Sequence, residues 1–390
     1  MSGVYIIGIG NTPVTQGESP VAGRLASQAV ARAIEDADVH RRDVSALYLG
    51  NMSAGLLEGQ QQLASLCAHA CGLKGVEAFT LEASCASGAA ALRTGFMAVA
   101  GGFHDIVVVC GVERLSHASR EEASCALATA AAREEANGHD KTFVALNASL
   151  MRHYLCAHAL SPKDLAPFAI TAHDNGLDNP DALLRTPLDM DRYLSSRVLD
   201  YPLRLMDAPP ICDGAAAVVL ANARIARARP ARNKPRVSIR ASAAASDSLS
   251  SRNCIDELRL PAAEQSSRRA YSQAGLGPRD IDLFEAHDAF TVITALSLES
   301  CGFAERGEAF RLGRDGALAR DGRLPISTMG GLKSRGHPVG ATGLYQVIEA
   351  TRQLQGTAGT NQVSNNPRTA MTQNLGGMGA TAITHVLEVA

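Results

Sequence analysis

Short apolar runs alternate with longer amphipathic stretches along most of this chain. Residues 4–9 predict a buried strand, and apolar residues that recur every three or four positions over residues 22–36 predict a helix. Residues 44–49 predict a second strand. The uninterrupted β-branched run at residues 106–110 is typical of a central strand that is covered on both faces. Strands and helices that alternate in this way indicate an α/β fold with a parallel or mixed sheet.

Two pairs of segments indicate a duplication within the chain. Residues 37–50 (ADVHRRDVSALYLG) align with residues 274–287 (AGLGPRDIDLFEAH), and residues 85–92 (CASGAAAL) align with residues 337–344 (HPVGATGL). The two intervals between partners are similar, which favours a single duplication event. On this alignment Cys85 and His337 occupy equivalent positions of the two copies.

The stretch from about residue 116 to residue 205 has no counterpart in the second half of the chain, and its polar segments contain helical patterns. We therefore predict three parts. Residues 1–115 and 206–255 form a first half, which contains Cys85, the candidate nucleophile discussed below. Residues 116–205 form an inserted, mostly helical loop domain that covers the active site. Residues 256–390 form a second half, which contains the candidate catalytic histidines His287 and His337.

Composition narrows the class of partner. The chain has 390 residues, 46% of them hydrophobic, a net charge of -2 and a pI near 6.6. It can bury one or two cores, and it has no overall attraction for nucleic acid or acidic membranes. Six arginines and one lysine lie between Arg224 and Arg240, which predicts either a solvated basic face or a site for phosphate groups. We expect a small-molecule substrate.

Cysteine usage and the N-terminus bear on the compartment. Nine cysteines without a disulfide-framework spacing suit a reducing compartment. The first residues show no secretion leader, and no run reaches the roughly 18 apolar residues of a spanning helix. We expect a cytoplasmic protein that does not enter the membrane.

Cys85 is the candidate nucleophile. It follows a predicted strand and begins a predicted helix, where backbone N–H groups and the helix dipole favour a thiolate. The small residues around it leave room for an acyl group. We expect inert roles for Cys67, Cys71, Cys110, Cys156, Cys212, Cys254 and Cys301. Cys67 and Cys71 with His69 lack distant metal ligands, so we predict no metal site.

Two histidines are expected beside that thiol. Equivalent positions of a duplicated fold meet near the pseudo-twofold axis, so His337 can act as the base that activates Cys85. His287 ends the other duplicated strand, and the carboxyl ends of strands open into the same crevice, where it can donate to an oxyanion. The glycine-rich turn at residues 374–379, which includes Asn374 and Gly376, lacks the context of a dinucleotide site and instead offers N–H groups to the thiol region.

These motifs together make the chain resemble the thiolase superfamily, and within it the sterol-carrier-protein-type and archaeal-type thiolases. The resemblance covers essentially the whole length. The segments that carry it are residues 84–88 (SCASG), 173–176 (HDNG) with Asn179-Pro180, 202–204 (PLR), 212–217 (CDGAAA), 287–290 (HDAF), 336–343 (GHPVGATG) and 373–377 (QNLGG).

The resemblance implies a fold of duplicated βαβαβ halves in an α/β/α/β/α layering. It implies that Cys85 is acylated, that His337 takes the thiol proton, and that His287 binds a thioester oxygen. The N–H groups of Cys85 and Gly376 would form a second oxyanion site. The substrate would be acyl-coenzyme A with no permanently bound cofactor, and the assembly a homodimer or homotetramer.

One departure from the family pattern opens alternatives. Many thiolases move the α-proton with a second cysteine, at the position of Asn374 or, in sterol-carrier-type members, of Ala289. Neither residue here can do acid/base work, so either a histidine takes that proton or the thiolase reaction is weak. The resemblance implies an acetyl-CoA acetyltransferase or 3-ketoacyl-CoA thiolase. The alternatives are a ketoacyl-synthase-like condensing enzyme and a thiolase-like subunit that works with a small zinc-bearing partner protein, while a retro-aldolase is disfavoured.

Overall fold

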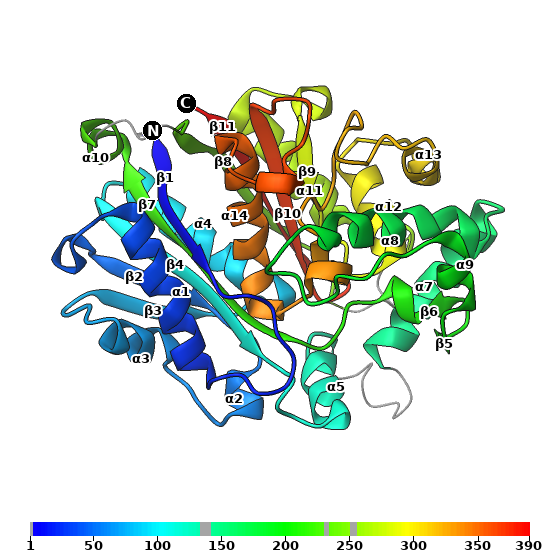
Figure 1. Cartoon of the computed structure of the whole chain (residues 1–390), viewed down its shortest axis with the longest axis horizontal. Coiled ribbons are helices and arrows are strands. Elements are labelled where there is room, and N and C mark those ends of the chain that lie inside the picture. The colour runs from blue at the N-terminus through cyan, green and yellow to red at the C-terminus, as the bar shows by residue number, and fades with distance from the viewer. Residues whose placement is uncertain (1–2, 133–141, 230–233, 250–255) are drawn as a thin grey trace.

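The fold is built on one large mixed sheet. The computed structural model describes residues 3–132, 142–229, 234–249 and 256–390, and nine of its strands form a sheet in the order β3-β2-β4-β7-β1-β8-β11-β10-β9 (Figure 1). The strands are β1 (Val4–Asn11), β2 (Ala46–Gly50), β3 (Glu77–Leu81), β4 (Ile106–Arg114), β7 (Asp213–Asn222), β8 (Val237–Ser246), β9 (Leu283–Glu285), β10 (Thr369–Gly376) and β11 (Thr381–Val389).

The strand order is symmetric about the antiparallel pair β1 and β8. Outward from β1 lie β7, β4 and β2, and outward from β8 lie β11, β10 and β9. The pairs β2–β4 and β9–β10 are parallel, and the other pairs in these two series are antiparallel. This order supports the predicted duplication. Strand β8 lies beside β11 of the second half, although it precedes the predicted boundary at residue 256, which stays a prediction.

Helices form three further layers. Helices α1 (Ala22–Ala37) and α3 (Leu63–Ala70) cover the outer face of the first half, and α11 (Pro261–Ala274) and α12 (Thr291–Ser300) that of the second. Helices α4 (Ser87–Ala100) and α14 (Thr342–Gln355) pack against each other between the two halves, at the centre of Figure 1. The predicted α/β/α/β/α layering is confirmed.

The repeat alignment is right for one pair of segments and shifted for the other. Helix α1 ends at Ala37 and α11 at Ala274, and a short 3-10 turn and a strand follow each of them at the same spacing. Cys85, however, lies two residues before α4, whereas His337 lies five residues before α14. The two side chains are therefore not strict equivalents. Both residues still precede the N-termini of the two central helices, α4 and α14. The helices approach each other so closely there that neither Gly88 nor Gly343 has room for a Cβ atom.

The inserted segment forms a lobe beside the second half, drawn in green in Figure 1. Its elements are α5 (Arg120–Ala128), α7 (Phe143–Ala157), α8 (Pro162–Leu177), α9 (Met190–Ser195), β5 (Val198–Asp200) and β6 (Leu203–Arg204). Helices α7 and α8 pack on α12, and α8 also packs on α13 (Ala309–Arg314), so that Phe168, Tyr154 and Phe284 share one hydrophobic core. Two further short α-helices of the described chain are α2 (Ala54–Leu57) and α10 (Ala223–Ala228).

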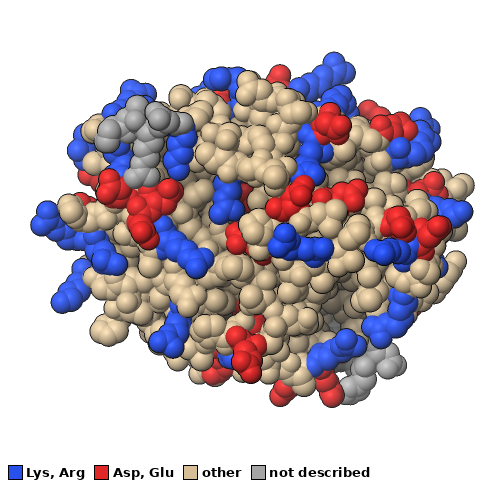
Figure 2. All heavy atoms as spheres, in the orientation of Figure 1, with Lys and Arg blue, Asp and Glu red and all other residues tan. Residues whose placement is uncertain are grey.

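The surface carries both signs of charge. On the face shown in Figure 2, Lys and Arg residues are interspersed with Asp and Glu residues. Within the basic segment, Arg224 pairs with Asp105 and Arg240 with Glu388, which favours the solvated basic face over a phosphate site for the described part of that segment. Cys254 and Arg232 lie outside the described residues. Among those that are described, no helix combines the length and the apolarity that crossing a bilayer requires.

Candidate active site

Cys85 sits in a tight turn between β3 and α4. The residue before it, Ser84, has a φ of 51°, a left-handed conformation that is rare for a residue with a side chain and that is often found at functional sites. Ser87 holds the turn, because its hydroxyl donates to the carbonyl of Ser84 (2.6 Å) and accepts from the N–H of Ala83 (2.9 Å). The turn presents the thiol of Cys85, which is 6% exposed, to a cavity.

His337 is held by its backbone and by its ring. Its N–H donates to the sulfur of Cys212 (3.1 Å), and its Nδ1 lies 2.7 Å from the hydroxyl of Thr342, the first residue of α14. Gly336, with a φ of 114°, allows the chain to turn immediately before the histidine. Because Nδ1 is engaged by Thr342, Nε2 is the ring nitrogen of His337 that is left to face the cavity.

His287 follows the end of β9. Its Nδ1 lies 3.0 Å from the side-chain nitrogen of Asn374 on β10, so its Nε2 is the nitrogen left to face the cavity. The rings of His287 and His337 meet edge to face, with centroids 5.2 Å apart. The sulfur of Cys85 and one nitrogen of each ring all lie within 4.8 Å of one another. The structure thus brings together the three residues that the sequence indicated.

The glycine-rich turn approaches the thiol through a different residue from the one expected. The backbone N–H of Gly377 hydrogen-bonds to the sulfur of Cys85, whereas Gly376 is the buried last residue of β10 and does not line the cavity. Asn374 also lies outside the cavity lining, behind His287. Ala289 lines the cavity.

The protonation states of the trio follow from burial. Burial raises the pKa of the Cys85 thiol to about 12, the Glu113 carboxylate adds to the rise, and the N–H groups of Gly377 and Cys85 offset it in part. Burial lowers the pKa of His287 to about 4 and the pKa of His337 well below its usual value. The N–H groups at this turn lower the pKa of the thiol, as the sequence led us to expect, but burial outweighs them. These shifts favour a neutral thiol beside neutral imidazoles.

Glu113 is a site residue that the sequence did not reveal. It lies at the end of β4, fully buried, and one carboxylate oxygen accepts from the N–H groups of Met52 (3.1 Å) and Gly340 (3.0 Å), while the other accepts from the N–H of Ser53 (3.1 Å). Gly340 belongs to the segment that leads from His337 into α14. The carboxylate therefore ties the histidine segment of the second half to the first half.

Two buried ion pairs lie beneath the histidines. Lys333 pairs with Asp288 (3.0 Å), the residue after His287, and Arg335 pairs with Glu349 on α14 (2.8 Å). Lys333 also donates to the backbone carbonyl of Asp288 (2.6 Å). Removing one partner from such a pair leaves an uncompensated buried charge, so the pairs hold the segments that carry both histidines in fixed positions.

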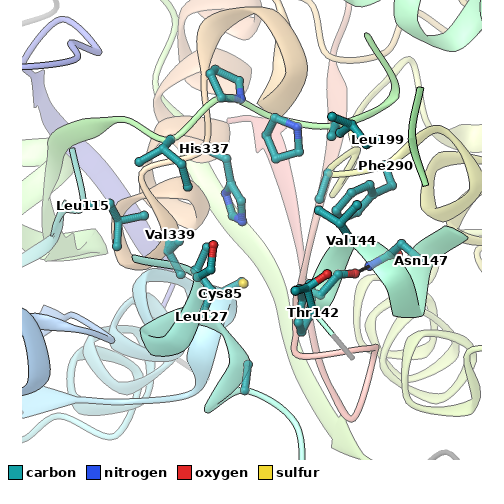
Figure 3. Close-up of a pocket in the computed structure, with 18 of the residues that line it drawn as sticks. Cys85, Leu115, Leu127, Thr142, Val144, Asn147, Leu199, Phe290, His337 and Val339 are labelled. Atoms are coloured by element: carbon teal, nitrogen blue, oxygen red, sulfur yellow. Dashed lines mark hydrogen bonds between the residues drawn. The ribbon is translucent and has the colours of Figure 1, made fainter. Parts of the chain in front are cut away.

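The cavity has a volume of about 480 Å³ and mostly apolar walls. In Figure 3, Leu115, Leu127 and Val339 lie on the side of Cys85, and Val144 and Phe290 face them across the cavity. The size lies within the range of about 300–1,000 Å³ that is usual for small-molecule sites. The described part of the basic segment around α10 contributes no residue to the lining, whereas Arg120 and Arg197 of the lobe do.

Among the described residues, Cys67, Cys71 and His69 do not gather into a second cluster of possible ligands. Cys67 and Cys71 are buried between α1 and α3, whereas His69 between them is exposed. Within the described part of the chain, Cys85 with the two histidines is the one group of three such ligands that lie close together.

Comparison with known proteins gives the family. Residues 4–186 match the thiolase N-terminal domain and residues 243–389 match the thiolase C-terminal domain-like family. The chain is 39% identical to the acetyl-CoA acetyltransferase of Methanothermobacter thermautotrophicus over 99% of both chains, and 29% identical to the benzoylsuccinyl-CoA thiolase subunit BbsB of Thauera aromatica over 96% of this chain and 94% of that one. A solved structure described as an Ltp2-ChsH2(DUF35) aldolase covers 99% of this chain and 98% of its own, with a TM-score of 0.86 and 24% identity, which shows the same fold.

The chain belongs to the thiolase family, and it is an enzyme of the acyltransferase class. The motifs predicted this family correctly.

Proposed function

We propose that the protein is a coenzyme A-dependent thiolase that works through an acyl group on Cys85. The sulfur attacks the carbonyl carbon of an acyl-CoA while its proton passes to Nε2 of His337. The carbon–sulfur bond to CoA then breaks, and the departing CoA thiolate takes that proton. The developing oxyanion would accept from the backbone N–H groups of Cys85 and Gly377, which lie beside the sulfur.

In the second half-reaction a further acyl-CoA enters with its thioester oxygen on Nε2–H of His287. Loss of an α-proton gives an enolate, whose carbon attacks the acyl group on Cys85. The new carbon–carbon bond forms, the bond to sulfur breaks, and the Cys85 thiolate recovers a proton. A histidine must take the α-proton, because neither Ala289 nor Asn374 can.

The observation that carries this proposal is the cluster of Cys85, His287 and His337 within 4.8 Å at a cavity. The test is CoA-dependent thiolysis of acetoacetyl-CoA by the wild type, by Cys85→Ala and by Cys156→Ala. Cys156 is an exposed cysteine of the lobe and serves as the control. We expect activity in the wild type and in Cys156→Ala and none in Cys85→Ala. Undiminished thiolysis by Cys85→Ala would refute the mechanism.

The cavity also supports a substrate larger than an acetyl thioester. A pantetheine arm can enter past Arg120 and Arg197, whose positive charges suit the phosphates of CoA, and apolar space lined by Val144, Phe290 and Ile293 then remains near the sulfur. The named substrate of the Thauera relative is likewise bulky. We infer that the acyl group is apolar and longer than acetyl.

The ketoacyl-synthase alternative is separated from this function by its substrate. Such an enzyme condenses malonyl thioesters with loss of carbon dioxide, whereas a thiolase splits 3-ketoacyl-CoA with free CoA. We expect no carbon dioxide from malonyl-CoA under conditions in which acetoacetyl-CoA is cleaved. Ready decarboxylative condensation without thiolysis would support the alternative.

Assembly is part of the proposal. We infer at least a homodimer, supported by the edge strand β3, which leaves Phe79 56% exposed. A small zinc-bearing partner protein also remains a proposal, to which the DUF35 component named for the structural neighbour adds support. Purification of the native complex, with activity assayed before and after its separation, tests it. Full activity of the isolated chain would exclude an obligatory partner.

A further inference from the structure

Gln346 on α14 has only one possible orientation. Its side-chain nitrogen lies within hydrogen-bonding distance of the backbone carbonyls of Glu285 (3.1 Å), Ala286 (2.7 Å) and Gln373 (3.0 Å). Carbonyl oxygens only accept, so the NH₂ group of the carboxamide must face them. Exchanging the two ends of the amide would set an oxygen against three buried oxygens. The side-chain oxygen of Gln346 therefore points the other way.

That oxygen fixes Asn374 in turn. The side-chain nitrogen of Asn374 lies 3.0 Å from Oε1 of Gln346 and 3.0 Å from Nδ1 of His287, and all three residues are buried. Because Oε1 of Gln346 can only accept, Asn374 must present its NH₂ group to both neighbours. Nδ1 of His287 consequently accepts a hydrogen bond and carries no proton. In the neutral ring the proton is then on Nε2, which faces the cavity.

His337 has a different kind of partner. Its Nδ1 contacts the Thr342 hydroxyl, which can donate as well as accept and which lies 3.4 Å from the carbonyl of Pro338. When Thr342 donates to that carbonyl it accepts from Nδ1–H, and Nε2 of His337 is free to accept a proton. The imidazolium form is equally compatible with this hydroxyl. His287 cannot take that form without losing its bond from Asn374.

We propose that Gln346 and Asn374 lock His287 as a neutral Nε2–H donor, and that His337 is therefore the single base of both half-reactions. The proposal rests on the thiolase mechanism above and assigns its α-proton. Gln346 and Asn374 are positioning residues that act through His287. Many thiolases have at position 374 the second cysteine that moves the α-proton. Here Asn374 takes that place, and its amide group keeps His287 as a hydrogen-bond donor.

The single base closes the proton balance. After the first half-reaction CoA leaves with the thiol proton, so His337 is again neutral with a free Nε2. It then takes the α-proton of the second acyl-CoA while His287 donates to the forming enolate oxygen. When the carbon–sulfur bond of the acyl-enzyme breaks, His337 returns this proton to the Cys85 thiolate. No further acid, base or oxidant is required.

The hydrogen bonds from Gln346 and Asn374 that fix His287 also bear on whether Cys85, His287 and His337 could bind zinc. One sulfur and two imidazole nitrogens are ligands that zinc accepts. Binding of a metal ion at Nε2 of His287 would move the ring proton to Nδ1, where it would meet the NH₂ group of Asn374. The hydrogen-bond network thus favours donation to a substrate oxygen over metal ligation.

Hydrogen exchange tests the assignment of the base without condensation. Cys85→Ala and the double variant Cys85→Ala/His337→Asn are incubated with acetyl-CoA in heavy water, and deuterium in the acetyl group is measured by mass spectrometry. We expect exchange with Cys85→Ala and a loss of at least about 100-fold in the double variant. Equal exchange by both variants, or exchange that requires Cys85 itself, would overturn the assignment.

Imidazole nitrogen spectra test the lock without any substrate. In protein labelled with ¹⁵N in the histidine rings, the signals of His287 are assigned by comparison with His287→Gln. We expect a protonated Nε2 and an unprotonated Nδ1 in the wild type, and a mixture of both tautomers in Gln346→Met.

The matched control is Gln353→Met, which removes another buried carboxamide of α14 that bonds to Asn361 and Val363. We expect Gln353→Met to leave the His287 tautomer and kcat unchanged. Gln346→Met should lower kcat by about 10-fold or more. The loss should not exceed the roughly 100- to 1,000-fold fall in kcat that follows removal of an oxyanion donor. A wild-type His287 tautomer in Gln346→Met would refute the lock. Absence of an acyl-enzyme in the wild type would instead refute the thiolase mechanism, so the two failures are distinguishable.

Discussion

At the scale of single residues, the site depends on buried polar groups that hold two loops together. Glu113 accepts from backbone N–H groups of both halves of the molecule. In Glu113→Gln one end of the side chain becomes a donor and faces N–H groups that then lack an acceptor. We expect a loss of stability of about 1–3 kcal/mol and a fall in kcat larger than the change in KM. Chemical unfolding and steady-state thiolysis measure both, and wild-type values would show that Glu113 does not hold the segment after His337.

Buried neutral histidines make stability depend on pH. Burial lowers the pKa of His287 to about 4 and the pKa of His385 on β11 to about 3. Between these values and the ordinary pKa, the unfolded chain binds more protons than the folded one, so stability rises with pH up to about 6.5 and falls as pH drops below it. Each histidine contributes up to about 2 kcal/mol of this loss between pH 7 and pH 5.

His385 provides the test, because it is buried and lies outside the cavity lining. In His385→Leu the free energy of unfolding should fall less between pH 7 and pH 5 than in the wild type. Urea unfolding at the two pH values gives the comparison. Parallel losses in the two proteins would show that His385 titrates normally in the folded state.

The three residues that meet at the cavity could be predicted from the sequence, whereas the buried polar residues around them could not. Cys85, His287 and His337 stand in recognisable motifs at strand and helix ends. Glu113 and Gln346 are single polar residues within an apolar strand and an ordinary helix. Their role comes from contacts with segments that are far away in the sequence, and no local pattern records such contacts.

At the scale of secondary-structure elements, helix α7 of the lobe forms one wall of the cavity. Val144 lies near its N-terminus and faces the Cys85 side (Figure 3). In Val144→Trp the added volume should lower kcat/KM for 3-ketoacyl-CoA of medium chain length by about 10-fold or more, while acetoacetyl-CoA is affected little. Val144→Ala should favour the longer substrates instead. An equal loss on short and long substrates would place the pantetheine arm, and not the acyl chain, against this wall.

Hydrophobic periodicity located the elements but not all of their relationships. Residues 22–36 were predicted as a helix, and α1 spans Ala22–Ala37. The sequence did not reveal that β8 pairs with both β1 and β11, because an isolated apolar run does not show its neighbours. The shifted equivalence of Cys85 and His337 has a similar cause, since the turn before α14 contains three more residues than the turn before α4.

At the scale of the whole molecule, the sheet ends at β3 with unpaired backbone groups and the exposed Phe79. We expect a mass of at least twice 40.8 kDa by light scattering for the wild type and a shift towards the monomer for Phe79→Glu, which introduces a charge at the edge strand. Phe103→Glu is the control, because Phe103 is 82% exposed and lies outside the strands. A monomeric wild type, or equal dissociation of both variants, would contradict a dimer that uses this edge.

The whole fold serves to bring one sulfur and two imidazoles from its two halves to one cavity. The direct test is intact-protein and peptide mass spectrometry of protein quenched shortly after mixing with acetoacetyl-CoA. We predict a single acetyl group on the peptide that contains Cys85 and no adduct in Cys85→Ala. An acetyl group on a different cysteine, or one that persists in Cys85→Ala, would contradict the account.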